Sequence, residues 1–123
     1  MILADTSIWI GHFRASEPWL VAFLGEDLVG CHQAVIEELA LGSIRQRGRV
    51  LALLESLQGF PVLTHDEVMT LVNRRQLGGR GLSAVDVHLL GSVMLTGGAR
   101  LWTRDKRLLA ACRDSGAAYV EES

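Results

Sequence analysis

The opening stretch MILADTSIWI (residues 1–10) places one carboxylate, Asp5, between two apolar runs. The run Ile2–Ala4 is typical of a short buried strand, so Asp5 stands where that strand ends. A charged group beside a core is costly unless another group pairs it, binds it or hydrates it. The rest of the chain has to provide that partner.

The chain beyond residue 10 alternates short apolar strands with longer helical patterns. Further strands are predicted at Leu28–Cys31, Pro61–Leu63, Leu101–Thr103 and Ala118–Val120. Helices are predicted at Ser7–Phe13, Pro18–Leu24, Ala34–Leu41, Arg49–Leu57, Glu67–Arg75, Ser83–Leu95 and Lys106–Arg113. Strands separated by helices favour an α/β fold in three α/β/α layers, with a central parallel sheet of four to five strands. Ligands bind such sheets beyond the carboxyl ends of the strands, where the strand order reverses, and Asp5 lies at such an end.

The bulk properties restrict the class of protein. A chain of 123 residues, 49% of them hydrophobic, predicts a single domain over residues 1–123 with a well-filled core. No apolar stretch is long enough to cross a bilayer, and the N-terminus lacks the basic region of a signal peptide. Cys31 and Cys112 match no metal or redox spacing, which favours a reducing compartment. We therefore expect a soluble, cytoplasmic protein with no membrane partner.

Four of the fourteen acidic residues lie outside the turns and polar chain ends where solvated charges are expected. Asp5 and Asp105 follow strands, whereas Glu38 and Asp86 lie in the helical patterns VIEELALG (35–42) and SAVDVHLLGS (83–92). Each has a simple structural explanation, because Asp5 and Asp105 can be N-caps, Asp86 can complete a capping box with Ser83, and Glu38 can be solvated. Acids at strand ends and on inward helix faces can also converge in one crevice. An all-oxygen site of that kind favours Mg²⁺ or Mn²⁺.

Four stretches resemble, in order and spacing, the acidic motifs of PIN-domain ribonucleases, in particular the VapC-like toxins of type II toxin–antitoxin pairs. They are ILADTSIWI (2–10), VIEELALG, SAVDVHLLGS and LWTRDKRL (101–108), and the similarity extends over nearly the whole chain. The resemblance implies a PIN-like fold and Mg²⁺- or Mn²⁺-dependent cleavage of RNA by metal-activated water. It also implies a cognate antitoxin and a homodimer.

Carried over residue by residue, the resemblance assigns the catalytic site to Asp5, Glu38, Asp86 and Asp105. Asp5 and Asp86 are the implied metal ligands, directly or through water. Glu38 and Asp105 would bind a second metal ion or lie in the outer coordination shell of the metal site. Glu38 is chosen over Glu37 because the acid of the family immediately precedes leucine.

Two further groups of residues are implied to support that site. Small polar residues of the family orient carboxylates or water, and here they are Thr6, Ser7 and Thr103. Arginines suit phosphate groups, and the candidates for holding the RNA backbone are Arg14, Arg80, Arg104 and Arg107.

Histidines and aromatic residues give weaker signals. His12, His32, His65 and His88 have no metal-ligand spacing, so ordinary surface or core roles are expected for them. Trp9, Phe13 and Trp19 are expected in the core, with a minority interpretation as part of an apolar groove for an antitoxin.

Other functions are less well supported by the residues. A phosphorylated receiver domain needs paired acids after its first strand, and an aspartyl phosphatase needs an acid at the position of Ser7. A PIN domain that processes RNA without an antitoxin, or that only binds RNA or protein, remains an alternative.

Overall fold

The computed structural model describes residues 1–122, which form four strands and seven helices. The strands are β1 (Ile2–Ala4), β2 (Val29–Cys31), β3 (Gln58–Gly59) and β4 (Arg100–Trp102). The helices are α1 (Thr6–Arg14), α2 (Pro18–Gly25), α3 (Gln33–Leu41), α4 (Arg47–Ser56), α5 (His65–Arg74), α6 (Ala84–Leu95) and α7 (Lys106–Ser115). All seven predicted helices are present, and their ends lie within two residues of the predicted ones.

The four strands form one parallel sheet in the order β3-β2-β1-β4. β1 is central because Ile2 is in register with Val29 of β2 on one side and with Arg100 of β4 on the other. The chain runs from β1 through β2 to β3 and then crosses back to add β4 at the opposite edge. The strand order therefore reverses at β1, directly before Asp5, and the predicted α/β class with a parallel sheet is confirmed.

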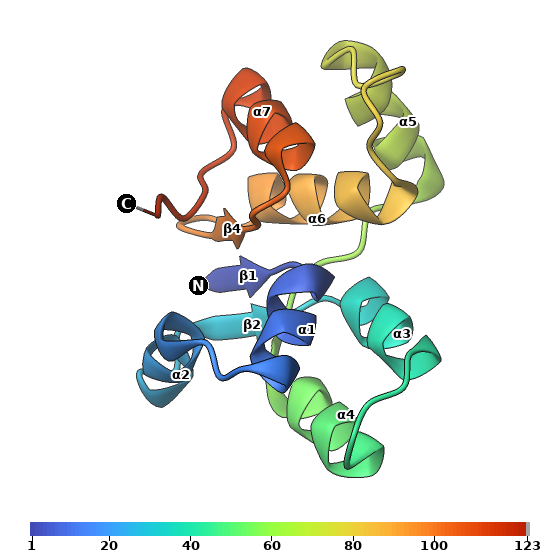
Figure 1. The fold of residues 1–123 in the computed structure, drawn as a ribbon. Helices are drawn as coiled ribbons and strands as arrows, with labels where there is room; N and C mark the ends of the chain where they lie inside the picture. Colours follow the sequence, from blue (N-terminus) through green and yellow to red (C-terminus); the bar gives the residue numbers. More distant parts are fainter. Residues whose placement is uncertain (123) are drawn as a thin grey trace.

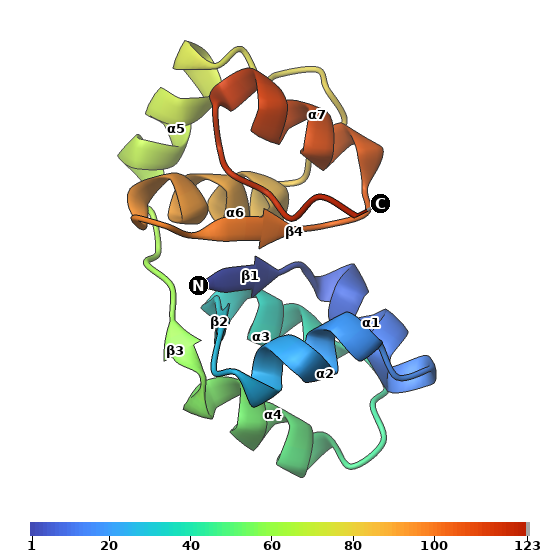
Figure 2. The same cartoon turned by 90° about the vertical axis from the view of Figure 1, so that its left-hand side faces the viewer.

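The helices divide between the two sides of β1. Figure 1 shows α5, α6 and α7 gathered with β4, and α1 to α4 gathered around β2, and Figure 2 shows the same division after a quarter turn. Contacts between α3 and α6 connect the two groups, and α3 also contacts α1 within its own group. Side chains from both groups can therefore meet beyond the end of β1.

Two predicted strands differ from the structure. The strand predicted at Pro61–Leu63 is wrong, and the chain pairs earlier, with Gly59 opposite Cys31 in β3. Pro61 has no N–H for the ladder, and its carbonyl accepts a hydrogen bond from the Ser92 hydroxyl of α6 at 2.7 Å. At Ala118–Val120 the structure has a single parallel bridge, between Tyr119 and Leu101, in place of a fifth strand.

The core lies on both faces of β1 and β4. Leu3, Trp9 and Trp102 are almost completely buried, which confirms the expected core role of Trp9. Phe13 is half-buried. The expectation for Trp19 is wrong, because its side chain is 42% exposed on α2 and packs edge-to-face on Phe23.

Burial also determines the state of the two cysteines. Cys31 and Cys112 are buried free thiols, and burial raises the pKa of each to about 11. Both therefore remain protonated and unreactive at neutral pH. No helix within residues 1–122 is both long enough and apolar enough to cross a membrane.

Candidate active site

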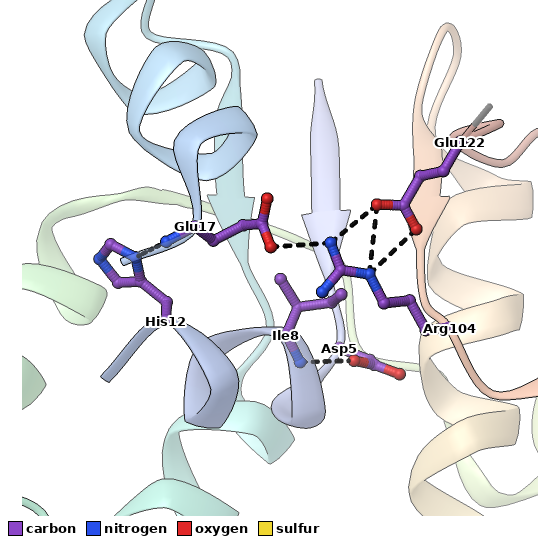
Figure 3. Close-up of polar contacts among 6 residues, drawn as sticks. All are labelled: Asp5, Ile8, His12, Glu17, Arg104 and Glu122. Atoms are coloured by element: carbon purple, nitrogen blue, oxygen red, sulfur yellow. Dashed lines mark hydrogen bonds and ion pairs between the residues drawn. The ribbon is translucent and has the colours of Figure 1, made fainter. Parts of the chain in front are cut away.

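Asp5 is held between β1 and β4 by hydrogen bonds to both of its carboxylate oxygens. Oδ1 accepts from the backbone N–H of Ile8 at 3.0 Å, so Asp5 is the N-cap of α1 (Figure 3). The same oxygen accepts from the Ser7 hydroxyl at 2.7 Å. Oδ2 accepts from the Thr103 hydroxyl, which directly follows β4. Three donors therefore compensate for the burial of this carboxylate, which is 7% exposed.

Glu38 is an exposed residue of α3 that reaches toward the start of α1. Its Oε1 accepts a hydrogen bond from the Thr6 hydroxyl at 2.5 Å. Thr6 immediately follows Asp5, so this bond brings the carboxylate of α3 to the end of β1.

Asp86 and Asp105 are both helix caps. Asp86 forms the capping box hypothesised with Ser83, because its Oδ2 accepts from the Ser83 backbone N–H at 3.0 Å. Asp105 is the N-cap of α7, and its Oδ1 accepts from the backbone N–H groups of Arg107 and Leu108 at 2.8 and 3.2 Å. Each of these caps uses one carboxylate oxygen, so the second oxygen is not required by the helix.

All four predicted acids line one small cavity beyond the end of β1. Its volume is about 190 Å³, and its lining consists of Asp5, Thr6, Ser7, Glu38, Val85, Asp86, Leu89 and Asp105. Thr103 is not part of the lining but supports it, because its hydroxyl donates to Asp5 and accepts from the backbone N–H of Asp105 at 3.1 Å. The lining carries four carboxylates and no basic side chain, so it is strongly negative.

The donor atoms of this cavity fit a hard divalent cation. Carboxylate and hydroxyl oxygens are the ligands that Mg²⁺ and Mn²⁺ prefer. Within residues 1–122, no three His, Cys, Asp or Glu side chains are grouped tightly enough to enclose an ion as they stand. The cavity therefore matches such an ion in chemistry, and the second oxygens of Asp86 and Asp105 are the atoms with freedom to turn toward it.

The four candidate arginines fall into two pairs. Arg80 and Arg104 are engaged by carboxylates, Arg80 by Asp114 at 2.7 Å and Arg104 by two glutamates (Figure 3). Arg14 and Arg107 form no ion pair within residues 1–122. Arg14 lies on α1 in the lining of a neighbouring groove, and the guanidinium of Arg107 packs against Gly81 in the loop before α6. The glutamates that hold Arg104 were not recognised from the sequence, because Glu17 lies 87 residues away from it along the chain.

A larger apolar groove adjoins the acidic cavity. Its volume is about 690 Å³, and its apolar lining is Ile10, Phe13, Leu39, Ile44 and Val50 from α1, α3, α4 and the segment before α4. Glu38 lines both the groove and the acidic cavity. Of the three aromatic residues considered for such a groove, Phe13 lines it.

The histidines have structural positions away from the acidic cavity. His32 follows β2 and caps α3, because its Nδ1 accepts from the Ala34 backbone N–H at 3.0 Å, and its ring faces that of His88 at 6.1 Å. Burial, followed by the nearby His88, lowers the pKa of His32, and Glu37 opposes this effect. His12 accepts from the Glu17 backbone N–H at 3.0 Å (Figure 3), and His65 begins α5.

Comparisons with known proteins place these features in context. The PIN domain family model matches residues 2–114. Two proteins named ribonuclease VapC32, from Mycobacterium tuberculosis strains CDC 1551 / Oshkosh and ATCC 25618 / H37Rv, are each 67% identical over 122 residues, covering 99% of this chain and 98% of theirs. The crystal structure of PAE2754 from Pyrobaculum aerophilum matches with a TM-score of 0.60 and 22% identity, over 89% of this chain and 83% of that one. At this identity the structural match shows a common fold.

Proposed function

Because this chain belongs to the PIN-domain family, with VapC ribonucleases among its relatives, we propose that it is a metal-dependent endoribonuclease and the toxin of a type II toxin–antitoxin pair. The observation that carries the proposal is the convergence of Asp5, Glu38, Asp86 and Asp105 on one cavity. These acids follow β1 and β4 or lie on α3 and α6, so elements from the whole chain build the site. Gathering four carboxylates in one cavity destabilises the fold when no cation is present, because like charges repel one another. Side-chain packing therefore does not explain their arrangement.

In this proposal Asp5 and Asp86 hold Mg²⁺ or Mn²⁺, and Glu38 and Asp105 act at a second ion or through water. The bound ion supplies Lewis acidity, which lowers the pKa of water and stabilises negative charge on the phosphodiester. Ser7 and Thr103 fix the rotation of the Asp5 carboxylate, and Thr6 positions Glu38. Val85 and Leu89 form an apolar part of the wall that limits water and strengthens electrostatic interactions in the cavity.

RNA approach to this site requires positive groups, because four carboxylates repel a phosphate backbone. Arg14 and Arg107 are the candidate arginines that no carboxylate neutralises within residues 1–122, so we assign them the first contacts with phosphates. Arg80 is paired with Asp114 and contributes less.

The antitoxin would bind along the apolar groove beside α1 and α3. A partner segment with apolar side chains would bury Ile10, Phe13 and Leu39. Because Glu38 lines both spaces, a basic side chain at the end of that segment would reach the carboxylates and block RNA. The protein would act in the cytoplasm, as a homodimer like the toxins that it resembles.

Cleavage by purified protein with Mg²⁺ or Mn²⁺ tests the proposal, with two variants of the same capping box. Asp86→Asn removes a cavity carboxylate and should reduce RNA cleavage at least about 100-fold, the range found when charge stabilisation at a reacting centre is lost. Ser83→Ala breaks the same capping box but leaves all four carboxylates, so it should cleave at close to the parent rate. Equal cleavage by the parent and Asp86→Asn would overturn the catalytic assignment.

Co-expression with the protein encoded beside it tests the toxin role. The parent alone should arrest bacterial growth, and a neighbouring antitoxin should bind it and restore growth. An active nuclease that is harmless and that no neighbour binds would favour RNA processing without an antitoxin.

A further inference from the structure

Arg104 stands at the edge of the acidic site but is turned into a separate ion-pair cluster. Its neighbours in sequence, Thr103 and Asp105, both belong to the site, and its guanidinium lies near the Asp5 end of β1 (Figure 3). Nε and Nη2 donate to the Glu122 carboxylate at 2.8–3.2 Å, and Nη2 also donates to Glu17 at 2.8 Å. One arginine is therefore shared by two carboxylates, so the cluster has a net negative charge.

The Arg104 cluster borders a cavity with the dimensions and side chains to hold part of a nucleotide. The cavity has a volume of about 420 Å³, and its lining includes Thr103, Arg104, Lys106, Arg113, Tyr119 and Glu122. Small-molecule sites usually have volumes of roughly 300–1,000 Å³. Three basic side chains and one aromatic ring are groups that contact phosphates and bases in single-stranded RNA. Thr103 joins this cavity to the acidic cavity through its bond to Asp5.

Glu122 makes three of the four hydrogen bonds to Arg104, but it is the more exposed of its two partners. Its side chain is 29% exposed and that of Arg104 is 49% exposed, so water and salt screen their attraction. The Glu17 side chain is 19% exposed, and its backbone is anchored at the start of α2 by the bond to His12. A phosphate offers a guanidinium the same bidentate acceptor pattern as a carboxylate. An RNA phosphate can therefore replace Glu122 on Arg104 without disturbing Glu17.

On the basis of the proposed ribonuclease function, we propose that Arg104 is a phosphate-binding site for RNA next to the acidic cavity, and that the Glu122 carboxylate occupies this site until an RNA phosphate displaces it. The C-terminal segment then competes with the substrate.

Binding of a fluorescent single-stranded RNA, measured by anisotropy in EDTA over a series of NaCl concentrations, tests this competition without cleavage. Glu122→Gln should bind RNA about two- to fivefold more tightly than the parent, the range set by exposed ion pairs. The slope of log K against log [NaCl] should steepen by up to about 0.7, the value for one further phosphate contact on a single strand. Glu121→Gln is the matched control, because it removes the same charge from the same cavity lining without breaking an ion pair to Arg104. Its gain in affinity should be clearly smaller.

A double-mutant cycle with Arg104→Gln assigns the effect to the arginine. In the Arg104→Gln background, Glu122→Gln should give no gain in affinity. Equal gains from Glu121→Gln and Glu122→Gln, or a gain that persists without Arg104, would overturn the inference while leaving the ribonuclease proposal intact. If the parent binds no RNA in EDTA, the inference fails, whereas the proposed function is tested separately by cleavage with Mg²⁺ or Mn²⁺.

Discussion

Two neighbouring parallel strands, β1 and β2, end on buried titratable side chains that cap the next helix, yet their surroundings differ. Asp5 is 7% exposed and caps α1, and His32 is 1% exposed and caps α3. Asp5 accepts from three donors and shares a cavity with three further carboxylates. The His32 ring accepts from one backbone N–H and faces the ring of His88. Burial and capping are common to both strand ends, so neither property separates them, whereas the gathering of four carboxylates in one cavity distinguishes the end of β1.

Three of the four carboxylates show that capping a helix and lining the acidic cavity are compatible. Asp5, Asp86 and Asp105 all cap helices, as the simplest structural explanation of each requires. A cap fixes the backbone and one oxygen of the carboxylate, and thereby holds the side chain in the lining of the cavity. Helix capping is therefore a means of positioning these acids.

The largest expected difference between the two strand ends is in catalysis. Asn is a good N-cap, so Asp5→Asn and His32→Asn should both keep the capping bond of their helices. Asp5→Asn removes a charge from the cavity and should reduce RNA cleavage at least about 100-fold. His32→Asn changes no group of the cavity and should cleave at close to the parent rate. Comparable losses in both variants would mean that the end of β1 is no more functional than the end of β2.

The second difference concerns stabilisation by metal. A ligand at about 100 times its dissociation constant stabilises the folded state by about 2.7 kcal/mol, which raises the melting temperature of a domain of this size by roughly 10 °C. Mn²⁺ should produce such a shift in the parent and in His32→Asn, measured by differential scanning fluorimetry. Asp5→Asn and Asp86→Asn should lose most of it. A shift of the same size in all four proteins would place the bound ion outside the acidic cavity.

A smaller effect separates the two roles of Asp105 in the absence of metal. Asp105→Ala removes both cap bonds, to Arg107 and Leu108, and should lower the free energy of unfolding by about 1 kcal/mol. Asp105→Asn keeps a capping oxygen and relieves repulsion in the cavity, so it should unfold at the parent urea concentration or higher. Both variants should respond less to Mn²⁺. If Asn destabilises as much as Ala, the charge of Asp105 has no unfavourable neighbours and the cavity is not strained by repulsion.

Local sequence patterns predicted much of this molecule because helices and caps depend on interactions between residues that are close in sequence. The seven helices, the strand Ile2–Ala4 and the capping box at Ser83 follow from periodicity and from side chains that satisfy nearby N–H groups. The four ordered motifs indicated the family, and the family model over residues 2–114 confirms it. Their acids were predicted to converge, and the structure places all four in one lining.

Features that depend on distant partners could not be read from the sequence. The apolar segment at Pro61–Leu63 has the composition of a strand, but its Pro61 carbonyl accepts a hydrogen bond from the Ser92 hydroxyl of α6 and not from a neighbouring strand. Arg104 reads as a free basic residue in LWTRDKRL, but Glu17 and Glu122 neutralise it from 87 and 18 residues away. These pairings form only when the whole chain is folded, and no local pattern encodes them.

The smallest expected effect is a pH dependence that arises at the end of β2. Burial and His88 lower the pKa of His32, with Glu37 opposing, so the folded state holds its ring neutral where the unfolded chain is already protonated. The unfolded state then binds more protons below its pKa of about 6.5, and stability must fall as the pH falls from that value toward the folded pKa. The parent should therefore unfold at lower urea concentration at about pH 5.5 than at pH 7.5, and His32→Asn should show a smaller decrease. His65→Asn, on the exposed start of α5, is the control and should behave as the parent does. If His32→Asn and the parent lose stability equally, the buried ring at the end of β2 does not carry the pH dependence.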